Sequence, residues 1–190
     1  EDGDLDLLGY SGTAHTIRWY ENTNGNGSQF VAHLIDANPD HIVDWQIADL
    51  DGDGQRDIVC THDWAGTVGW YRKSGAGFAA EITLVSQPLG IESMDLADFD
   101  GDGDLDLLCS SENTQRIYWA ENTGSATFGT LQPLLQLQGQ DPLSTRAGDF
   151  DGDGDPDVLC HGGPWGQVGW CENLDGNGTF SSLHVMQSLL

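Results

Sequence analysis

The chain has 190 residues and carries 31 acidic side chains against 6 basic ones, which gives a formal net charge of −25 at pH 7. This charge excludes unaided binding to nucleic acid or to an anionic membrane surface, because no basic patch could neutralise the phosphate groups. No apolar run approaches the roughly 18 residues that a membrane-spanning helix needs.

Four copies of one unit follow one another along the chain. DLDGDGQRDIVC at 49–60 recurs as DFDGDGDLDLLC at 98–109 and as DFDGDGDPDVLC at 149–160, and EDGDLDLL at 1–8 is the same motif entered at its fourth position. A Trp at 19, 70, 119 and 170 and a Phe at 30, 78, 128 and 180 keep the same register. Three signals in one register predict a repeat protein with units of approximately 1–41, 42–90, 91–140 and 141–190.

Each unit predicts strands in chain order and no capped helix. In the second unit, 42–48 alternates in part and leads into the Asp cluster, 57–60 is a short apolar run, 67–71 is β-branched and aromatic, and 78–85 closes the unit. Four short antiparallel strands in about 50 residues are typical of a β-propeller blade. We therefore predict an all-β fold of about four blades, the first incomplete, within one propeller segment over residues 1–190.

The Asp cluster has the spacing of a loop that binds a hard cation. In D-x-D-G-D-G-x-x-D, carboxylates stand at positions 1, 3, 5 and 9, and the glycines allow the tight curl that brings them together. Without a metal, such carboxylates repel one another by roughly 1–3 kcal/mol per pair. Solvated Asp-Gly turns are the alternative, but a cluster repeated three times in full favours bound cations.

Calcium is the expected metal, since an all-oxygen site without His or Cys suits Ca²⁺, Mg²⁺ or Mn²⁺, and Ca²⁺ tolerates irregular geometry. An EF-hand is excluded by the Cys at its twelfth position and by the flanking strands. A backbone carbonyl at position 7, in Gln55, Asp104 or Asp155, would complete the ligand ring. The predicted side-chain ligands of the three full sites are Asp49, Asp51, Asp53, Asp57, Asp98, Asp100, Asp102, Asp106, Asp149, Asp151, Asp153 and Asp157, and Asp2, Asp4 and Asp6 remain in a partial fourth site.

These motifs resemble the FG-GAP/VCBS repeat family over nearly the whole chain. The resemblance rests on the Asp loops and on ENTNGNGSQF and ENLDGNGTF, which are similar to the turn before the family's outer strand. It implies a β-propeller of the integrin-α type with structural Ca²⁺ on one rim, held by the aspartates named above. It also implies an extracellular, secreted or cell-surface location.

The first unit begins inside its metal loop and the last ends soon after its Phe, so we expect the chain to be part of a larger propeller. A closed four-bladed ring, or two copies that complete one ring, are the alternatives.

Cys60, Cys109 and Cys160 occupy one repeat position and are expected to be buried free thiols, because equivalent positions on neighbouring blades are too far apart for a disulfide; Cys171 has no repeat counterpart. A bridge between Cys160 and Cys171 is a less favoured alternative. The repeated Trp are expected to pack between blades, and His62 and His161 show no metal-ligand pattern. Asn26 and Asn177 lie in glycosylation sequons, which matter only in a eukaryotic source.

Trp64 and Trp165 stand in the links on the rim opposite the metal loops, where each could stack on a sugar ring or fold over its blade. No catalytic constellation is present, so we expect a non-enzymatic module for adhesion, recognition or scaffolding that binds a protein or glycan ligand or further copies of itself. A lectin that uses the two Trp, the propeller part of a secreted sugar-processing enzyme and a filament unit are the alternatives.

Overall fold

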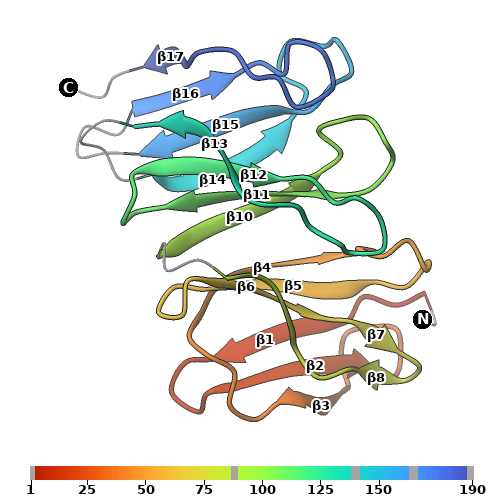
Figure 1. Ribbon diagram of the computed structural model, residues 1–190. Coiled ribbons are helices and arrows are strands. Elements are labelled where there is room, and N and C mark those ends of the chain that lie inside the picture. Colours follow the sequence, from red (N-terminus) through yellow and green to blue (C-terminus); the bar gives the residue numbers. More distant parts are fainter. Residues whose placement is uncertain (1–2, 87–89, 138–141, 163–166, 188–190) are drawn as a thin grey trace.

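The computed structural model describes residues 3–86, 90–137, 142–162 and 167–187. Within these residues the chain is built of β-strands and turns, without a helix (Figure 1). The prediction of an all-β fold is therefore confirmed. The described part of the chain also contains no helix that could span a bilayer.

Four antiparallel sheets follow one another along the sequence. The first sheet consists of β1 (Leu7–Ser11), β2 (Thr16–Asn22) and β3 (Phe30–Asp36). The second consists of β4 (Ile42–Ala48), β5 (Asp57–His62), β6 (Thr67–Tyr71) and β9 (Ile82–Ser86). The third consists of β10 (Ile91–Ala97), β11 (Asp106–Ser111), β12 (Arg116–Ala120) and β13 (Gln132–Gln136). The fourth consists of β14 (Pro142–Gly148), β15 (Asp157–Gly162), β16 (Gln167–Cys171) and β17 (His184–Gln187).

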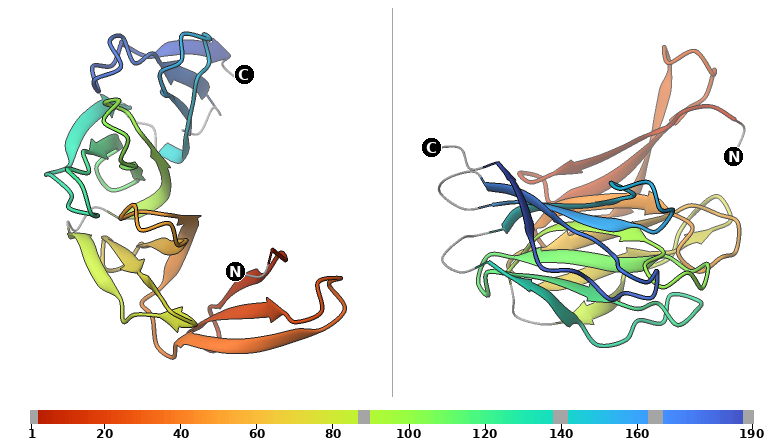
Figure 2. Two further views of the ribbon diagram at one scale, coloured as in Figure 1. Left: turned by 90° about the vertical axis from the view of Figure 1, so that its right-hand side faces the viewer. Right: turned by 90° about the horizontal axis from the view of Figure 1, so that it is seen from above.

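Each complete sheet is a four-stranded meander whose strands pair in sequence order, as in a propeller blade. The first sheet has three strands and lacks an innermost one, as the predicted incomplete blade requires. In Figure 2 the sheets are arranged along an open arc, with the first and fourth sheets at its two ends. The alternative of a ring closed by these four blades alone is therefore wrong, because the arc stays open.

Three apolar cores lie between successive sheets. The strands alternate in facing the preceding and the following sheet, so one strand serves two cores. In β11, Leu107 and Cys109 pack against the second sheet, whereas Leu108 packs against the fourth. Strand β5 follows the same rule, with Cys60 toward the first sheet and Val59 toward the third. Among the described residues, the apolar cores therefore lie between neighbouring blades, and the fold depends on these contacts.

The cysteines fill these cores as predicted. Cys60, Cys109, Cys160 and Cys171 are all buried free thiols. Burial raises the pKa of the Cys109 thiol to about 12 and that of Cys160 to about 11, which makes both unreactive near neutral pH. The Cys160–Cys171 disulfide is not formed; in the register of β15 and β16, Cys160 lies opposite Gly169 instead.

The repeated Trp contact the neighbouring blade in the three described interfaces. Trp70 belongs to the core between the second and third sheets, and Trp119 to that between the third and fourth. The Lys73 ammonium of the second blade lies 4.5 Å from the centre of the Trp19 ring. Packing between blades, as predicted, is thus the role of these three side chains.

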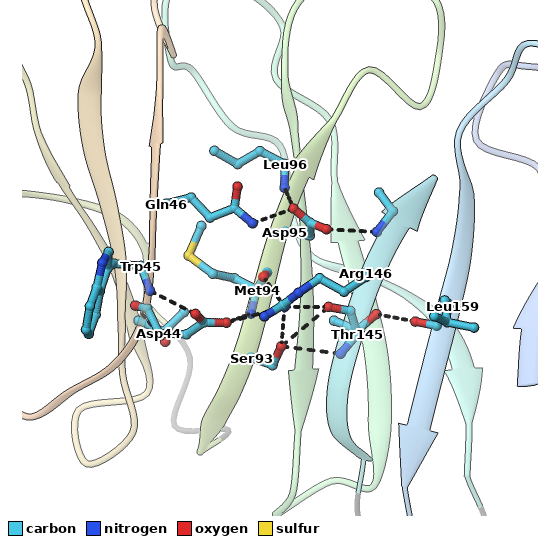
Figure 3. Close-up of polar contacts among 12 residues, drawn as sticks. Asp44, Trp45, Gln46, Ser93, Met94, Asp95, Leu96, Thr145, Arg146 and Leu159 are labelled. Carbon is cyan, nitrogen blue, oxygen red and sulfur yellow. Dashed lines mark hydrogen bonds and ion pairs between the residues drawn. The ribbon is translucent and has the colours of Figure 1, made fainter. Parts of the chain in front are cut away.

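A polar network joins the innermost strands β4, β10 and β14 (Figure 3). Asp44 of β4 accepts a hydrogen bond from the Met94 amide of β10 (3.1 Å), and Asp95 of β10 accepts one from the Ala147 amide of β14 (2.9 Å). Arg146 of β14 donates to the Met94 carbonyl (3.0 Å). Neighbouring blades thus bind each other's backbone through the strands that lead into the Asp loops.

The fourth strand of the second blade differs from its prediction. Phe78 does not begin that strand but pairs with Lys73 in a two-residue ribbon of β7 (Lys73–Ser74) and β8 (Gly77–Phe78), and pairing with β6 resumes at Ile82. Phe128 and Phe180 make isolated bridges to Asn122 and Asn173 in the same way. In the second, third and fourth blades the Phe therefore closes the turn that precedes the outer strand, whereas Phe30 of the first blade begins β3.

Candidate metal centres

The three complete Asp loops connect the first and second strands of their blades. They are the second loop (residues 49–57), the third loop (98–106) and the fourth loop (149–157), and all lie at one end of the strands (Figure 1). In the third loop, Gly101 and Gly103 have φ of 75° and 97°, a region that only glycine enters at little cost. The glycines at positions 4 and 6 of the other two loops also have positive φ, which curls each loop onto its carboxylates.

The first Asp of each loop lies at the centre of this curl. In the third loop, Asp98 accepts hydrogen bonds from the amides of Gly101 (2.8 Å) and Gly103 (3.0 Å). In the fourth, Asp149 accepts them from Gly152 and Gly154. In the second, Asp49 accepts them from the amides of Asp53 and Gly54. Side chain and backbone thus hold the loop in one shape.

The ninth Asp is completely buried and joins three segments of its blade. Asp106 accepts hydrogen bonds from the Phe99 amide inside the loop (2.9 Å) and from the Asn122 amide after β12 (2.8 Å). Asp157 repeats this with Phe150 and Asn173. Burial raises the pKa of Asp106 to about 6, although these two amides act in the opposite direction.

Carboxylate oxygens converge in all three loops. Groups of three have ligand atoms within 4.8 Å of one another: Asp49, Asp51 and Asp53; Asp98, Asp100 and Asp106; Asp149, Asp151 and Asp157. Oxygen-only clusters of this kind are ligand sets for hard cations. Three acidic clusters that could hold a metal ion therefore occur once per complete blade, as predicted.

One atom supports the fit of a cation directly. The Asp51 side chain is only 7% exposed, and its Oδ1 is buried without a hydrogen-bond partner. A buried carboxylate oxygen without a partner costs stability, and a bound cation would remove this cost. In the third loop, burial and the charges of Asp102 and Asp98 raise the pKa of Asp100 despite a hydrogen bond from the Asp102 amide. The residues present thus fit a cation.

The side chain of the seventh residue is placed differently in the second loop than in the third and fourth loops, where it lies beside a glycine of the turn before the outer strand. Asp155 lies against Gly176, where an added Cβ would be 2.6 Å from the carboxylate, and Asp104 lies beside Gly124. Gln55 donates from its side-chain amide to Asp53 (3.2 Å). Ligation by the backbone carbonyl at this position, as the sequence suggests, remains a prediction.

The fifth Asp of the third and fourth loops lies outside the groups of three. Asp102 and Asp153 each accept a hydrogen bond from the amide two residues on, at 2.9 and 3.0 Å. Their role as ligands remains a prediction.

The first loop is different. Asp6 keeps the role of the ninth Asp and accepts a hydrogen bond from the Asn22 amide (2.8 Å). Asp4, at the seventh position, lies against Gly25 beside a shallow pocket of about 420 Å³. Asp2 lies outside the described residues. Among the residues that are described, this loop contributes no group of three ligands.

Two buried Asn were not predicted as functional residues. The Asn122 side chain donates to the Leu50 carbonyl of the preceding blade's loop (3.3 Å), and Asn173 donates to the Phe99 carbonyl (2.8 Å). Each Asn thereby links its own blade to the metal loop of the blade before. Their signal in the sequence is the repeated Trp-x-Glu-Asn motif, which the second blade replaces with Trp-Tyr-Arg-Lys.

Trp64 lies in the turn between β5 and β6, at the other end of the strands from the loops (Figure 1). Its side chain is 73% exposed and stacks on the His41 ring, with centroids 4.7 Å apart and planes at 9°. Asp63 holds both residues, since it accepts from the Trp64 amide (2.7 Å) and pairs with His41 Nδ1 (2.9 Å). Trp165 lies outside the described residues, and Asn26 and Asn177 are exposed.

A known repeat family matches most of the chain. The FG-GAP-like repeat model matches residues 1–60, 49–109 and 98–160. No curated protein matches the chain in sequence.

Three solved structures match the chain, and two of them reach a TM-score of 0.50 or more. An Agrocybe aegerita lectin that recognises non-reducing terminal N-acetylglucosamine is 19% identical with a TM-score of 0.63, and the match covers 95% of this chain and 52% of the lectin. The Photorhabdus luminescens Tc holotoxin pore is 20% identical with a TM-score of 0.50, over 98% of this chain and 9% of the toxin. The V. cholerae biofilm matrix protein Bap1 is 19% identical with a TM-score of 0.48, over 94% of this chain and 28% of that protein.

The chain therefore spans about half of the lectin and a smaller share of the other two proteins. At these identities the likeness to the lectin and to the toxin pore concerns the fold alone. The family match is more specific, because its three stretches together span residues 1–160 in the register of the Asp loops. The chain belongs to the FG-GAP-like repeat family.

Proposed function

We propose that the chain is a calcium-stabilised, non-enzymatic β-propeller segment that serves recognition or scaffolding outside the cell. The observation that carries this proposal is the convergence of three carboxylates in each of three loops, together with the unpartnered, buried Oδ1 of Asp51. Calcium suits these loops because it accepts irregular sets of six to eight oxygens, which a curled backbone provides more easily than an octahedron.

Bound calcium would neutralise the carboxylates and lock the connection between the first two strands of each blade. The first Asp already shapes the loop and the ninth Asp already joins it to the third strand, so the ion would tighten an existing arrangement. The loop also carries the carbonyl that the next blade's Asn binds, as between Phe99 and Asn173. Calcium would therefore stabilise the interfaces between blades as well as the loops.

An extracellular role agrees with the family and with the net charge of −25, which disfavours nucleic acid and anionic membranes as partners. We propose a protein or glycan ligand as the partner. We also propose that further blades, in the same polypeptide or in another copy, extend the open arc.

Thermal unfolding with and without a calcium chelator tests the metal. A site that binds only the folded chain stabilises it by about 2.7 kcal/mol at 100 times its Kd, so three sites supply about 8 kcal/mol. For a chain of this size, each kcal/mol corresponds to about 2–4 °C. We expect EDTA to lower the melting temperature by well over ten degrees and excess Ca²⁺ to restore it. An unchanged melt would contradict a structural role for calcium.

A matched pair of variants in the third loop separates ligation from charge. Asp100→Asn removes a carboxylate that converges with Asp98 and Asp106, whereas Asp104→Asn removes the same charge from a side chain that lies beside Gly124. We expect Asp100→Asn to lower calcium affinity at least tenfold and Asp104→Asn to change it less than threefold, as measured by isothermal titration calorimetry. Equal losses in the two variants would show that only the overall charge matters.

Carbohydrate binding through Trp64 is the second candidate. A flat, exposed indole that is held by His41 and Asp63 offers a pre-organised surface for a sugar ring. The Agrocybe aegerita lectin, which shares the fold, recognises a terminal sugar. These two observations favour a glycan over a protein ligand at this rim.

A glycan array compares the wild-type chain with Trp64→Ala and, as a control, with Trp45→Ala, which removes a less exposed indole on β4. We expect loss of glycan signal only for Trp64→Ala. An array without signals, or signals that survive this substitution, would exclude Trp64 as a sugar platform.

A further inference from the structure

The three Asp loops are not equivalent, because an arginine from outside the second loop pairs with its carboxylates. Arg72 follows β6, where its guanidinium forms ion pairs with Asp51, through Nε, and with Asp53, through Nη2 at 3.0 Å. Both of these carboxylates belong to the convergent group of the second loop. The guanidinium of an arginine stays protonated in proteins, so Arg72 brings a fixed positive charge to this group.

This arrangement occurs in one blade. In the Trp-x-x-x motif that follows the third strand, the residue equivalent to Arg72 is Glu21 in the first unit, Glu121 in the third and Glu172 in the fourth. The second loop is also less acidic itself, since Gln55 and Arg56 stand where the third loop has Asp104 and Leu105. One blade has thus exchanged an acidic side chain beside its loop for a basic one that reaches the loop.

The two carboxylate oxygens of Asp51 differ in their contacts. The guanidinium binds Oδ2, and Oδ1 remains buried without a partner. Arg72 thus satisfies the outer edge of the cluster, while one inner oxygen stays available to a cation. A calcium ion at that oxygen would lie near a fixed positive charge, and Coulomb repulsion between them would weaken its binding.

We propose that Arg72 is a built-in counter-ion that makes the second loop the weakest calcium site of the three and the one that best keeps its shape without calcium. The guanidinium supplies part of the positive charge that an ion supplies in the third and fourth loops. As the calcium concentration falls, the second loop would lose its ion first and keep its shape through Arg72. The third and fourth loops would lose their ions at lower concentrations and have no such substitute. This inference rests on the proposed calcium binding.

Site-resolved titration of the metal-free chain tests the inference. The amide protons of Gly54, Gly103 and Gly154 occupy the sixth position of the three loops, and each binds its loop's first Asp. In proton–nitrogen NMR spectra recorded during a Ca²⁺ titration, we expect the Gly103 and Gly154 signals to shift first. We expect Gly54 to shift only at calcium concentrations at least tenfold higher.

Three variants assign the difference to Arg72. Arg72→Gln removes the charge, and the Gly54 transition should then fall within threefold of the other two, while the melting temperature in EDTA falls below that of the wild type. Arg72→Lys keeps the charge, so the Gly54 signal should still shift at higher calcium concentrations than the other two signals. Arg116→Gln is the matched control, because it removes one positive charge at the start of β12, far from the loops along the strand, and should leave the order of the signals unchanged.

The outcomes separate the two proposals. If none of the three glycine signals moves and no heat is released, calcium binding itself is wrong, and the inference falls with it. If all three signals move together in the wild-type chain, or if Gly54 stays late in Arg72→Gln, calcium binding holds and the role of Arg72 is overturned.

Discussion

A network of hydrogen-bonded side chains joins the first two blades. His62 of β5 is 1% exposed, and its Nε2 donates to Glu81 (2.9 Å). Tyr71 donates to the other oxygen of Glu81 (2.8 Å) and lies 3.2 Å from Asp36 at the end of β3. At the equivalent interfaces the positions of Tyr71 and Glu81 are apolar, for example Ala120 and Leu131. The second blade thus substitutes a hydrogen-bonded network for part of its apolar core.

This network predicts a dependence of stability on pH. Burial lowers the pKa of His62, but the hydrogen bond and the charge of Glu81, together with Asp40, raise it above its ordinary value overall. Burial raises the pKa of Glu81, but the hydrogen bonds from His62 and Tyr71 lower it overall. The His62 contribution to the free energy of unfolding is therefore complete below about pH 6.5 and is lost as the pH rises further, and that of Glu81 is lost below about pH 4.5.

Thermal melts of the wild-type chain and of His62→Gln in saturating calcium check this sign. We expect the difference in melting temperature between them to be largest near pH 5.5–6.5 and to shrink steadily toward pH 9, because the variant keeps an amide donor for Glu81 but has no titrating charge. A difference that grows toward pH 9 would mean that His62 is neutral in the folded protein.

The sequence predicted the identity of the loop carboxylates better than their individual roles. Spacing alone placed Asp106 among the ligands, and it lies in the convergent group. That the same carboxylate accepts the Asn122 amide could not be predicted, because this contact depends on where the third strand of the blade ends. Arg72 was missed for a similar reason, since the ion pair with Asp51 joins residues 21 positions apart through the register of β5 and β6.

At the scale of elements, the second residue of the second and third Asp loops packs into the core shared with the next blade. Leu50 is 1% exposed within the core between the second and third sheets. Phe99 is completely buried, with its ring 5.6 Å from that of Phe180 in the following blade. Phe150 occupies the same position in the fourth blade but is 47% exposed, and it contacts Trp170 of its own blade, with ring centroids 6.2 Å apart. Among the described residues no blade follows the fourth one, so Phe150 has no neighbouring core to fill.

A pair of substitutions measures how much this loop residue contributes to the free energy of unfolding. We expect Phe99→Ala to lower the free energy of unfolding by about 3–5 kcal/mol, because it leaves a cavity between two blades. We expect Phe150→Ala to cost less than about 1.5 kcal/mol in the chain as it stands, since much of that ring already contacts solvent. Chemical denaturation in saturating calcium gives both values. Equal costs would contradict the role of the loop residue as an inter-blade contact.

The strands themselves were largely predictable because period-2 patterning and turn residues both recur at each step of the repeat. β4 and β6 have the predicted bounds, 42–48 and 67–71. The outer strand was placed too early, because the aromatic residue at Phe78 was read as a strand residue although it closes a turn with Lys73. An aromatic side chain that packs against a neighbouring blade has the same local signature as one within a strand.

At the scale of the whole molecule, the three interfaces between blades are of two kinds. The two between the second, third and fourth sheets have an Asn that binds the preceding loop, and the network of innermost strands crosses both of them. The interface between the first and second sheets has Lys73 in place of the Asn. Its ammonium lies over the rings of Trp19 and Phe78 at 4.5 and 4.7 Å. The first sheet also has three strands where the others have four, so we expect its attachment to be the weakest along the arc.

Because each blade contacts only its neighbours, local opening should follow this order of interfaces. We expect hydrogen exchange in calcium to be fastest in the amides of β1 and β2 and slowest in those of β11, which is buried along its whole length. Lys73→Gln, which removes the cation from Trp19, should speed exchange in β2 at least severalfold and leave β11 unchanged. Peptide-resolved mass spectrometry measures both. If β2 and β11 exchange at the same rate in the wild-type chain, the four sheets open as one cooperative unit, and the distinction between the two kinds of interface has no energetic consequence.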